Sequence, residues 1–286
     1  MKNESNKVVF PQLAQWVLDH SKKSNNPFVH DSSRLIKDGL SLLEKLPEDY
    51  RWLYSSLDAH KNKIDDLKLS VKQTPIDCNR VHWNDYARNW EAYAIMSYWR
   101  GVELIIPAIR GLNLHEMLAP AVLSRSLLEL SATFLQNANI FQKYVEGLPD
   151  MHSNLVVSSK LEILTNKAIW GNRMVGKDDP LMAKNVLSTL QSISKVPNAS
   201  DLYSIYEYLC EVAHPNAMGN ARFWSHVESV DKYGYEKRVI SRFANTNHVE
   251  EMLDNTLWSL GWGSSVIHAA FMINSAALRT LIDKLK

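Results

Sequence analysis

Apolar side chains recur at intervals of three and four residues along most of the chain, and residues that interrupt helices are scarce. The 286 residues include 10 glycines and 10 prolines. Because the α-helix repeats about every 3.6 residues, this spacing gathers apolar side chains on one face, which must be buried against another element. The chain is long enough to bury a sizeable core. The pattern therefore predicts an all-α fold, a bundle of long antiparallel helices.

The expected elements follow from where the periodicity starts and stops. We expect helices near residues 9–22, 32–46, 48–72, 83–110, 120–138, 154–170, 181–194, 200–213 and 248–284. The helix at 48–72 follows from "PEDY", whose proline and acids suit a first helical turn. Two alternating runs, "WSHVESV" and "YEKRVISR", predict a small β-hairpin near residues 222–242. A polar turn, "KQTPIDCNR", separates a helical N-terminal extension, residues 1–78, from the bundle, residues 79–286.

The charge balance and the cysteines limit the class of protein only loosely. A formal net charge of +1 lacks the basic excess of many nucleic-acid-binding proteins, so charge alone identifies no partner. Cys78 and Cys210 are isolated, which argues against a disulfide framework and a zinc site. The N-terminal "MKNESNKVVFPQ" has no uninterrupted apolar stretch. We expect a cytoplasmic protein with no metal and no cofactor.

Residues 257–278 contain no charged side chain and are long enough to span a bilayer. They also carry His268, Asn274 and several serines, which are costly in hydrocarbon unless they find partners. A helix that is apolar all round is also what the centre of a large bundle requires. We favour a buried C-terminal helix and expect no membrane partner.

An aromatic stripe follows one face of the helix expected at 83–110. Its members are Trp83, Tyr86, Trp90, Tyr93, Ser97, Arg100, Leu104 and Ala108. The stripe could be a ligand platform, but aromatic residues at helical spacing more often fill a core. We favour the core interpretation.

Two pairs of charged residues lie on helices that are otherwise apolar. Arg125 and Glu129 are four residues apart in "LSRSLLELS", and Arg100 and Glu103 lie in "WRGVELIIP". If buried, these charges must be paired, because an isolated buried charge is strongly unfavourable. The four side chains form either a structural network of ion pairs or a functional polar pocket, and the sequence leaves both open.

His214 lies between the helix expected at 200–213 and Pro215. Proline disfavours helical geometry at the residue before it, so the helix should end near His214. The negative end of the helix dipole favours a protonated imidazole there, and Glu211 is near enough along the helix to pair with it. His214 could act as an acid, a base or an anion contact, or it could cap the last carbonyl groups.

A helix carrying "RSLLE", followed about eighty residues later by "YEYLCEVAHPNAMG", resembles a family of uncharacterised bacterial helical proteins related to the HEPN superfamily. The likeness covers roughly residues 83–285. It implies a bundle that often dimerises, with an arginine and a histidine from each subunit in a shared cleft that cleaves RNA without metal. His214 matches the histidine, but no arginine precedes it at the family's spacing, where the positions are Glu207, Tyr208 and Leu209.

The resemblance leads to a specific site hypothesis. The expected catalytic residues are His214 and Arg125, with Arg125 supplying the missing charge from another helix and Glu129 and Glu211 orienting them. The expected ligand-binding residues are Asn216, Arg100, Glu103, Tyr208 and Arg222. Arg222 precedes two aromatic residues that could stack on a base or could close the end of the bundle.

Two functions remain open at this point. The first is a HEPN-like, homodimeric protein that binds RNA or nucleotides, a degenerate metal-independent RNase of a bacterial defence or stress system. The second is a non-catalytic scaffold or protein-interaction protein whose polar residues are structural. The first requires His214 and Arg125 to converge on an open cleft, whereas the second does not.

Overall fold

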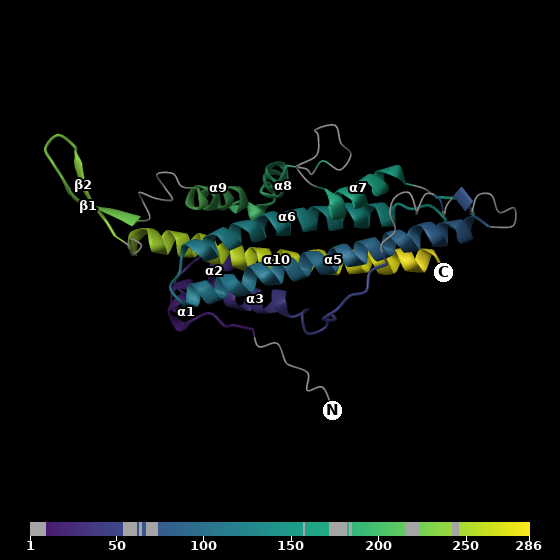
Figure 1. Ribbon diagram of the computed structural model, residues 1–286, viewed down its shortest axis with the longest axis horizontal. Coiled ribbons are helices and arrows are strands. Elements are labelled where there is room, and N and C mark those ends of the chain that lie inside the picture. Colours follow the sequence, from purple (N-terminus) through teal and green to yellow (C-terminus); the bar gives the residue numbers. More distant parts are fainter. Residues whose placement is uncertain are drawn as a thin grey trace, which may run out of the picture. The chain divides into compact units, whose positions relative to one another are not determined.

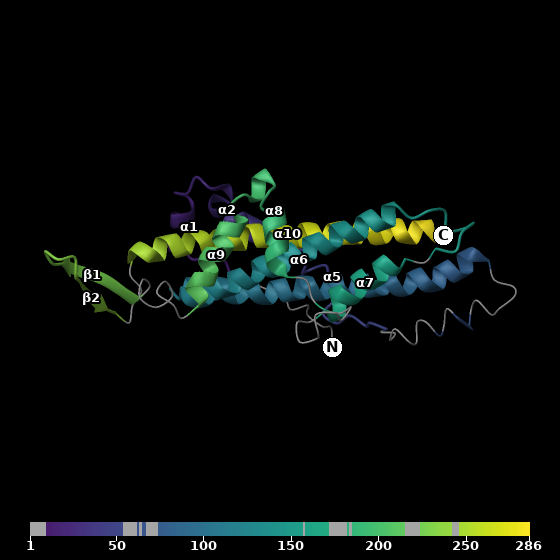
Figure 2. The ribbon, with the colours of Figure 1, turned by 90° about the horizontal axis from the view of Figure 1, so that it is seen from above.

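The computed structural model describes residues 10–53, 62, 65–66, 74–156, 158–171, 182, 185–214, 224–241 and 246–286. Its helices are α1 (Gln15–Ser21), α2 (Pro27–His30), α3 (Ser32–Leu40), α5 (Pro75–Asn113), α6 (Leu118–Glu146), α7 (Ser159–Trp170), α8 (Val186–Ile193), η1 (Pro197–Ala199), α9 (Leu202–Ala213) and α10 (Thr246–Lys284). The strands of the described residues, β1 (Ser225–Val230) and β2 (Glu236–Ile240), form one antiparallel hairpin (Figures 1 and 2). The predicted all-α fold with a small hairpin is confirmed.

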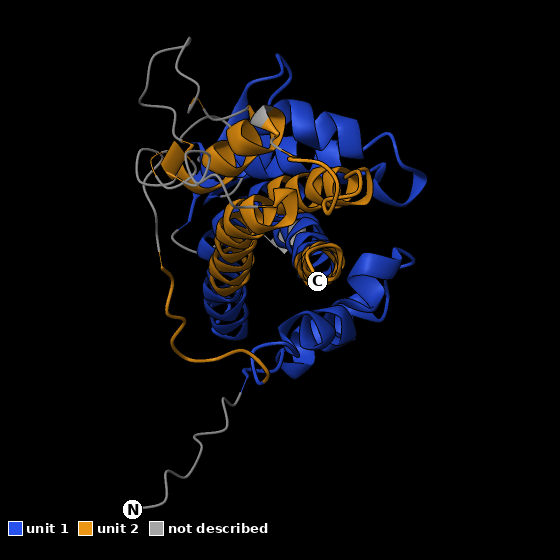
Figure 3. Ribbon diagram, turned by 90° about the vertical axis from the view of Figure 1, so that its right-hand side faces the viewer, with its two compact units in different colours: residues 1–44, 100–132, 186–266 blue, residues 45–99, 133–185, 267–286 orange. Residues whose placement is uncertain are grey.

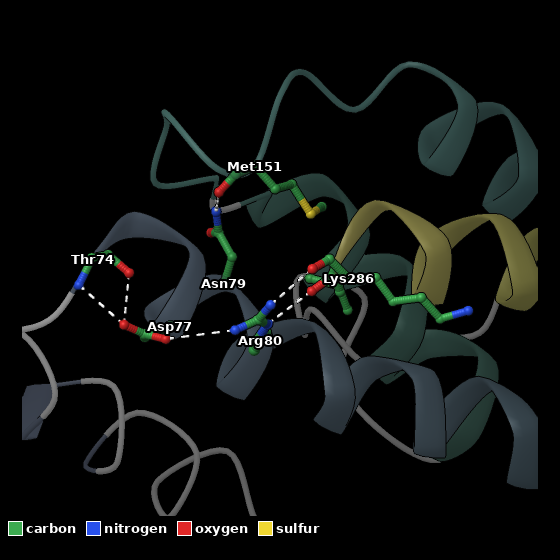
Figure 4. Close-up of polar contacts among 7 residues, drawn as sticks. Thr74, Asp77, Asn79, Arg80, Met151 and Lys286 are labelled. Atoms are coloured by element: carbon green, nitrogen blue, oxygen red, sulfur yellow. Dashed lines mark hydrogen bonds and ion pairs between the residues drawn. The ribbon is translucent and has the colours of Figure 1, made fainter.

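Helix α5 begins earlier than the sequence predicted, inside the segment that was expected to be a polar turn. Thr74 precedes the helix and Pro75 occupies its first position, where a missing N–H costs nothing. The backbone N–H and the hydroxyl of Thr74 donate to Oδ2 of Asp77, at 3.3 and 2.6 Å (Figure 4). The "TPID" segment is therefore a helix start with a cap, not a break.

The predicted helix at 48–72 is wrong for its first residues, 48–53. Residues 47–53 are not helical. The hydroxyl of Tyr50 donates to Oε2 of Glu91 (2.7 Å), and Nε1 of Trp52 donates to Oδ1 of Asn89 (3.0 Å). These bonds hold residues 46–53, here named the strap, along α5, and they replace the local bonds that a helix would make. Of residues 54–73, only 62, 65 and 66 are described, and they are helical.

The chain divides into two units, each assembled from three stretches of sequence (Figure 3). Unit 1 comprises residues 1–44, 100–132 and 186–266, and unit 2 comprises residues 45–99, 133–185 and 267–286. The long helices α5, α6 and α10 each contribute one part to unit 1 and another to unit 2. The boundary expected after residue 78 stays a prediction.

The core of unit 2 is aromatic. Trp83, Trp90, Phe134 and Phe141 have no exposed surface. The ring of Trp90 stacks on Phe141 with 4.4 Å between centroids, and its Nε1 donates to Oγ1 of Thr165 (2.9 Å). Burial of such rings supplies a large apolar contribution to stability, and the indole N–H finds its partner. The aromatic residues of the predicted stripe are all buried, which confirms the core interpretation for Trp83, Tyr86, Trp90 and Tyr93.

Small residues let helices of unit 1 approach one another closely. A Cβ atom on Gly39 in α3 would lie 2.7 Å from Ser264 in α10, and one on Gly261 would lie 2.5 Å from the carbonyl oxygen of Phe28 in α2. A larger residue would force these helices apart, because the interior is already close-packed. The first half of the uncharged segment 257–278 is buried here, including Leu257, Trp258, Leu260 and Trp262.

Within the part of the chain that the structure describes, two helices are long and apolar enough to cross a membrane, as judged by length and composition. They are α6 and the part of α10 from His248 to Lys284. In the most apolar 18-residue stretch of each helix, 44% of the residues of α6 and 28% of those of α10 are buried. A helix at the centre of a bundle would be buried on all sides, so neither stretch is a fully central core helix. These helices are weak indications on their own, and the absence of a membrane partner stays a prediction.

Candidate functional site

Arg125 of α6 is the centre of a polar cluster between α6 and α9 in unit 1. Its Nη2 lies 3.2 Å from Oε1 of Glu129, one helical turn further along α6, so the predicted pair forms. Nε donates to Sγ of Cys210 (3.0 Å) and Nη2 to the hydroxyl of Tyr206 (3.2 Å), both on α9. The Tyr206 hydroxyl in turn donates to Oε1 of Glu129 (2.7 Å). We name these four residues the α6–α9 cluster.

The cluster is half-buried and its charges are balanced. The side chains of Arg125 and Glu129 are 27% and 33% exposed, so water reaches one side of the ion pair. The guanidinium carbon also lies 5.3 Å from the centre of the Tyr206 ring, within the range of a cation–π contact. A charge in this position is stabilised by several polar contacts and still has a solvent-facing side.

Burial and the contacts of the cluster shift the pKa of two of its members. Burial lowers the pKa of Arg125, but its hydrogen bonds to Cys210 and Tyr206 and the charge of Glu129 outweigh that effect. The net result raises the pKa of Arg125, so the guanidinium stays charged. Burial, followed by the hydrogen bond to Glu129, raises the pKa of Tyr206, so its hydroxyl remains a donor at neutral pH.

His214 terminates α9, as predicted. Its backbone is extended, with φ −86° and ψ 143°, and its N–H donates to the carbonyl oxygen of Cys210 (3.0 Å). The side chain is exposed. Among the described residues, no hydrogen bond or ion pair joins the imidazole to the α6–α9 cluster. The structure therefore joins Arg125 and Glu129 but leaves the predicted convergence with His214 without a direct contact.

Arg100 and Glu103 do not join an internal network, and that expectation was wrong. Both side chains are exposed on α5. Their position follows from the phase of the helix, because Val102, Ile105 and Ala108 form the buried face instead. The spacing of charges within an apolar segment predicted burial, but these two charges occupy the side of the helix that water covers.

The other predicted site residues divide between α9 and undescribed segments. Tyr208 is half-buried and Glu211 is exposed on α9. Asn216 and Arg222 lie outside the described residues. No three histidine, cysteine, aspartate or glutamate side chains of the described residues are grouped so that they could hold a metal ion.

Tyr206 and Cys210 were not recognised as site residues from the sequence. They are four residues apart, on the α9 face that also buries Leu202, Leu209 and Val212. A tyrosine hydroxyl on an apolar helix face needs a buried partner, and the Arg125–Glu129 pair needed one as well. This shared need for a hydrogen-bond partner is the feature of the sequence that could have predicted the contact between Tyr206 and the Arg125–Glu129 pair.

Comparisons with known proteins add no relative to this geometry. No family model matches the chain, and no curated protein or solved structure is significantly similar to it.

Proposed function

We propose that this chain is a HEPN-like protein that binds RNA or nucleotides through the α6–α9 cluster. The observation that carries the proposal is the meeting of the two sequence motifs. "RSLLE" supplies Arg125 and Glu129, "YEYLC" supplies Tyr206 and Cys210, and the four side chains bond to one another. Motifs far apart in sequence thus meet at a charged and partly exposed arginine, which supports a binding site at this position.

Arg125 is the residue best suited to a phosphate. Its Nη1 has no hydrogen-bond partner among the described residues, whereas Nε and Nη2 hold the guanidinium in a fixed orientation. An oriented arginine loses less entropy when it binds an anion, and its N–H groups match phosphate oxygens. A phosphate bound there would compete with Glu129 for the charge of Arg125. The proposal therefore has two parts, binding through Arg125 and RNA cleavage by His214, and each part has its own test.

Binding is tested by fluorescence anisotropy with a labelled mixed-sequence RNA and, separately, a labelled adenine nucleotide. Arg125→Gln should weaken binding by about tenfold or more, because it removes a charge-assisted hydrogen bond. Arg110→Gln, which removes the same charge from an exposed position on α5, should change the affinity little. Equal affinities for the two variants, or no binding of either probe by the natural protein, would overturn the proposal.

Cleavage is tested with an RNA pool in EDTA, using the natural protein, His214→Ala and His30→Ala. His30 is another exposed histidine at a helix end and serves as the matched control. Cleavage that disappears in His214→Ala alone would establish a metal-independent RNase. No cleavage by any of the three proteins would restrict the proposed function to binding.

A second function, a scaffold or interaction protein, is favoured by the hairpin. Apolar side chains are exposed along it, with Val230 59%, Tyr235 76% and Ile240 82% exposed. A lone two-stranded hairpin is marginally stable in water, and free strand edges can pair with another strand.

The occupant we propose for the hairpin is a second copy of the chain. Residues 225–240 carry Glu228, Asp231 and Glu236 against Lys232, Lys237 and Arg238, so their charges cancel and two copies would not repel each other. The test is the molar mass in solution by light scattering. A dimer that Ile240→Lys dissociates supports this function, and a monomeric natural protein contradicts it.

A further inference from the structure

Unit 2 contains a cavity beneath the strap, between the strap and the helices α5 and α10. Its volume is about 380 Å³, which falls within the range of small-molecule sites. Apolar side chains dominate the walls, among them Ile95 of α5, Phe271 and Leu278 of α10, and Leu46 of the strap. All the residues that border it belong to unit 2, and none belongs to the α6–α9 cluster.

Asn274, one of the residues that border the cavity, has a buried polar atom that lacks a partner. Asn274 has no exposed surface, and its Nδ2 donates to the carbonyl oxygen of Trp90 (3.2 Å). Its Oδ1 is buried without a hydrogen-bond partner among the described residues. If the side-chain amide were rotated by 180°, Oδ1 would face the carbonyl oxygen of Trp90, and two acceptors would repel each other. The bond to Trp90 therefore fixes Oδ1 as the unpaired atom. A buried acceptor without a donor is unfavourable, and Asn274 carries that cost at the wall of the cavity.

The charged groups that border the cavity are an engaged carboxylate and an unengaged guanidinium. Glu91 accepts from the hydroxyl of Tyr50 at 2.7 Å, and this bond closes the strap over α5. Arg279 is exposed and makes no ion pair or hydrogen bond with a described residue. Because Glu91 already has a partner, Arg279 is the charge that remains for a ligand, and guanidinium favours the oxygens of carboxylates and phosphates.

We infer that the cavity binds a small amphipathic acid, whose apolar body lies against Phe271, Ile95 and Leu278 and whose carboxylate or phosphate meets Arg279. This site goes beyond the proposed RNA or nucleotide binding, since it uses a different unit and different residues. Failure of either proposal leaves the other standing.

The test is calorimetric titration of the full chain with four compounds that share one alkyl chain: decanoate, decyl phosphate, decanol and decylamine, each below its micelle concentration. We expect one site, with at least one of the two acids binding about fivefold or more tightly than decanol. The better acid identifies the head group. Equal binding of decanol, tighter binding of decylamine, or no binding of either acid would overturn the inference.

Variants locate the site. Arg279→Gln should remove the preference for the acid over decanol, whereas Lys160→Gln, an exposed cation on α7 away from the cavity, should keep it. Both positions are exposed, so neither change should affect folding. Ser275→Leu should fill the cavity and abolish binding of acid and alcohol alike while the thermal midpoint is kept. Unchanged binding by Ser275→Leu, or equal effects of the two charge changes, would contradict the location.

Discussion

Two asparagines in the described part of unit 2 are fully buried, and their amides are used very differently. Asn79, near the start of α5, uses its whole amide, and Figure 4 shows its bond to Met151. Its Nδ2 donates to the carbonyl oxygens of Met151 (2.7 Å) and Asn154 (2.6 Å), and its Oδ1 accepts from the backbone N–H of Val156 (2.9 Å). A single side chain thereby supplies the hydrogen bonds that the loop after α6 would otherwise lack.

Asn274, in the middle of α10, makes one bond through Nδ2 and leaves its Oδ1 unpaired. Both asparagines have zero exposed surface, so burial does not distinguish them. The difference is the number of bonds, since a saturated buried amide stabilises the fold, whereas an unsaturated one carries the cost of desolvation. For these two asparagines, complete bonding accompanies a role in holding a loop, and incomplete bonding occurs in a residue that borders a cavity.

The largest effect is expected at the saturated amide. Asn79→Ala would leave two carbonyl oxygens and one N–H of the loop without their partner. We expect the free energy of unfolding to fall by roughly 3 kcal/mol, about 1 kcal/mol for each lost bond. Urea unfolding followed by circular dichroism measures this change. A loss below about 1 kcal/mol would show that water replaces the amide and would remove one side of the comparison.

The α6–α9 cluster should behave like the saturated amide, with a somewhat smaller effect because it is half-buried. Arg125→Met keeps the apolar stem and removes every polar contact of the guanidinium. We expect a loss of roughly 2 kcal/mol, against less than about 0.5 kcal/mol for Arg110→Met at an exposed position.

A double-mutant cycle with Tyr206→Phe sharpens the test of the cluster. The Tyr206 hydroxyl accepts from Arg125 and donates to Glu129, so the two changes remove overlapping contacts. We expect a coupling free energy of about 1 kcal/mol. Additive effects, measured by the same unfolding experiment, would show that the cluster is not a network.

Replacement of the unsaturated amide should cost little or no stability. Asn274→Leu removes the unpaired acceptor at the cost of one long hydrogen bond to Trp90. We expect the free energy of unfolding to stay within about 1 kcal/mol of the natural value or to rise. A loss as large as that of Asn79→Ala would mean that the two asparagines are equivalent, and the comparison would fail.

The sequence predicted the long helices, the end of α9 and the hairpin, because each depends on local periodicity or local turn chemistry. Gly234 illustrates this, since its φ of +88° suits a glycine in the turn between β1 and β2. The strap could not be predicted in the same way. "PEDY" has local helix-start chemistry, but the bonds of Tyr50 and Trp52 to α5 involve residues distant in sequence.

The same limit separates the predicted and the missed parts of the two sites. The i,i+4 spacing predicted the contact between Arg125 and Glu129 within one helix, but their partners on α9 depend on how that helix packs. Arg100 and Glu103 were misplaced because an apolar segment does not reveal which face meets its neighbours. The cavity at Asn274 requires the strap, which the sequence did not predict.

The smallest expected effect concerns the cap beside Asn79. The carboxylate of Asp77 accepts hydrogen bonds from the hydroxyl and the backbone N–H of Thr74, and it also lies near the guanidinium of Arg80 (Figure 4). These contacts, with the Thr74 hydroxyl contributing most, hold the pKa of Asp77 below its ordinary value. A carboxylate with a lowered pKa in the folded state stabilises the fold above its unfolded pKa of about 3.9, and this stabilisation is lost as the pH falls through the lower, folded value. Asp77→Asn should therefore be less stable than the natural protein near neutral pH, and the gap should shrink in acid. Thermal unfolding across that pH range checks this, with Asp49→Asn as a matched exposed carboxylate; a gap independent of pH would assign the role of Asp77 to packing and not to its charge.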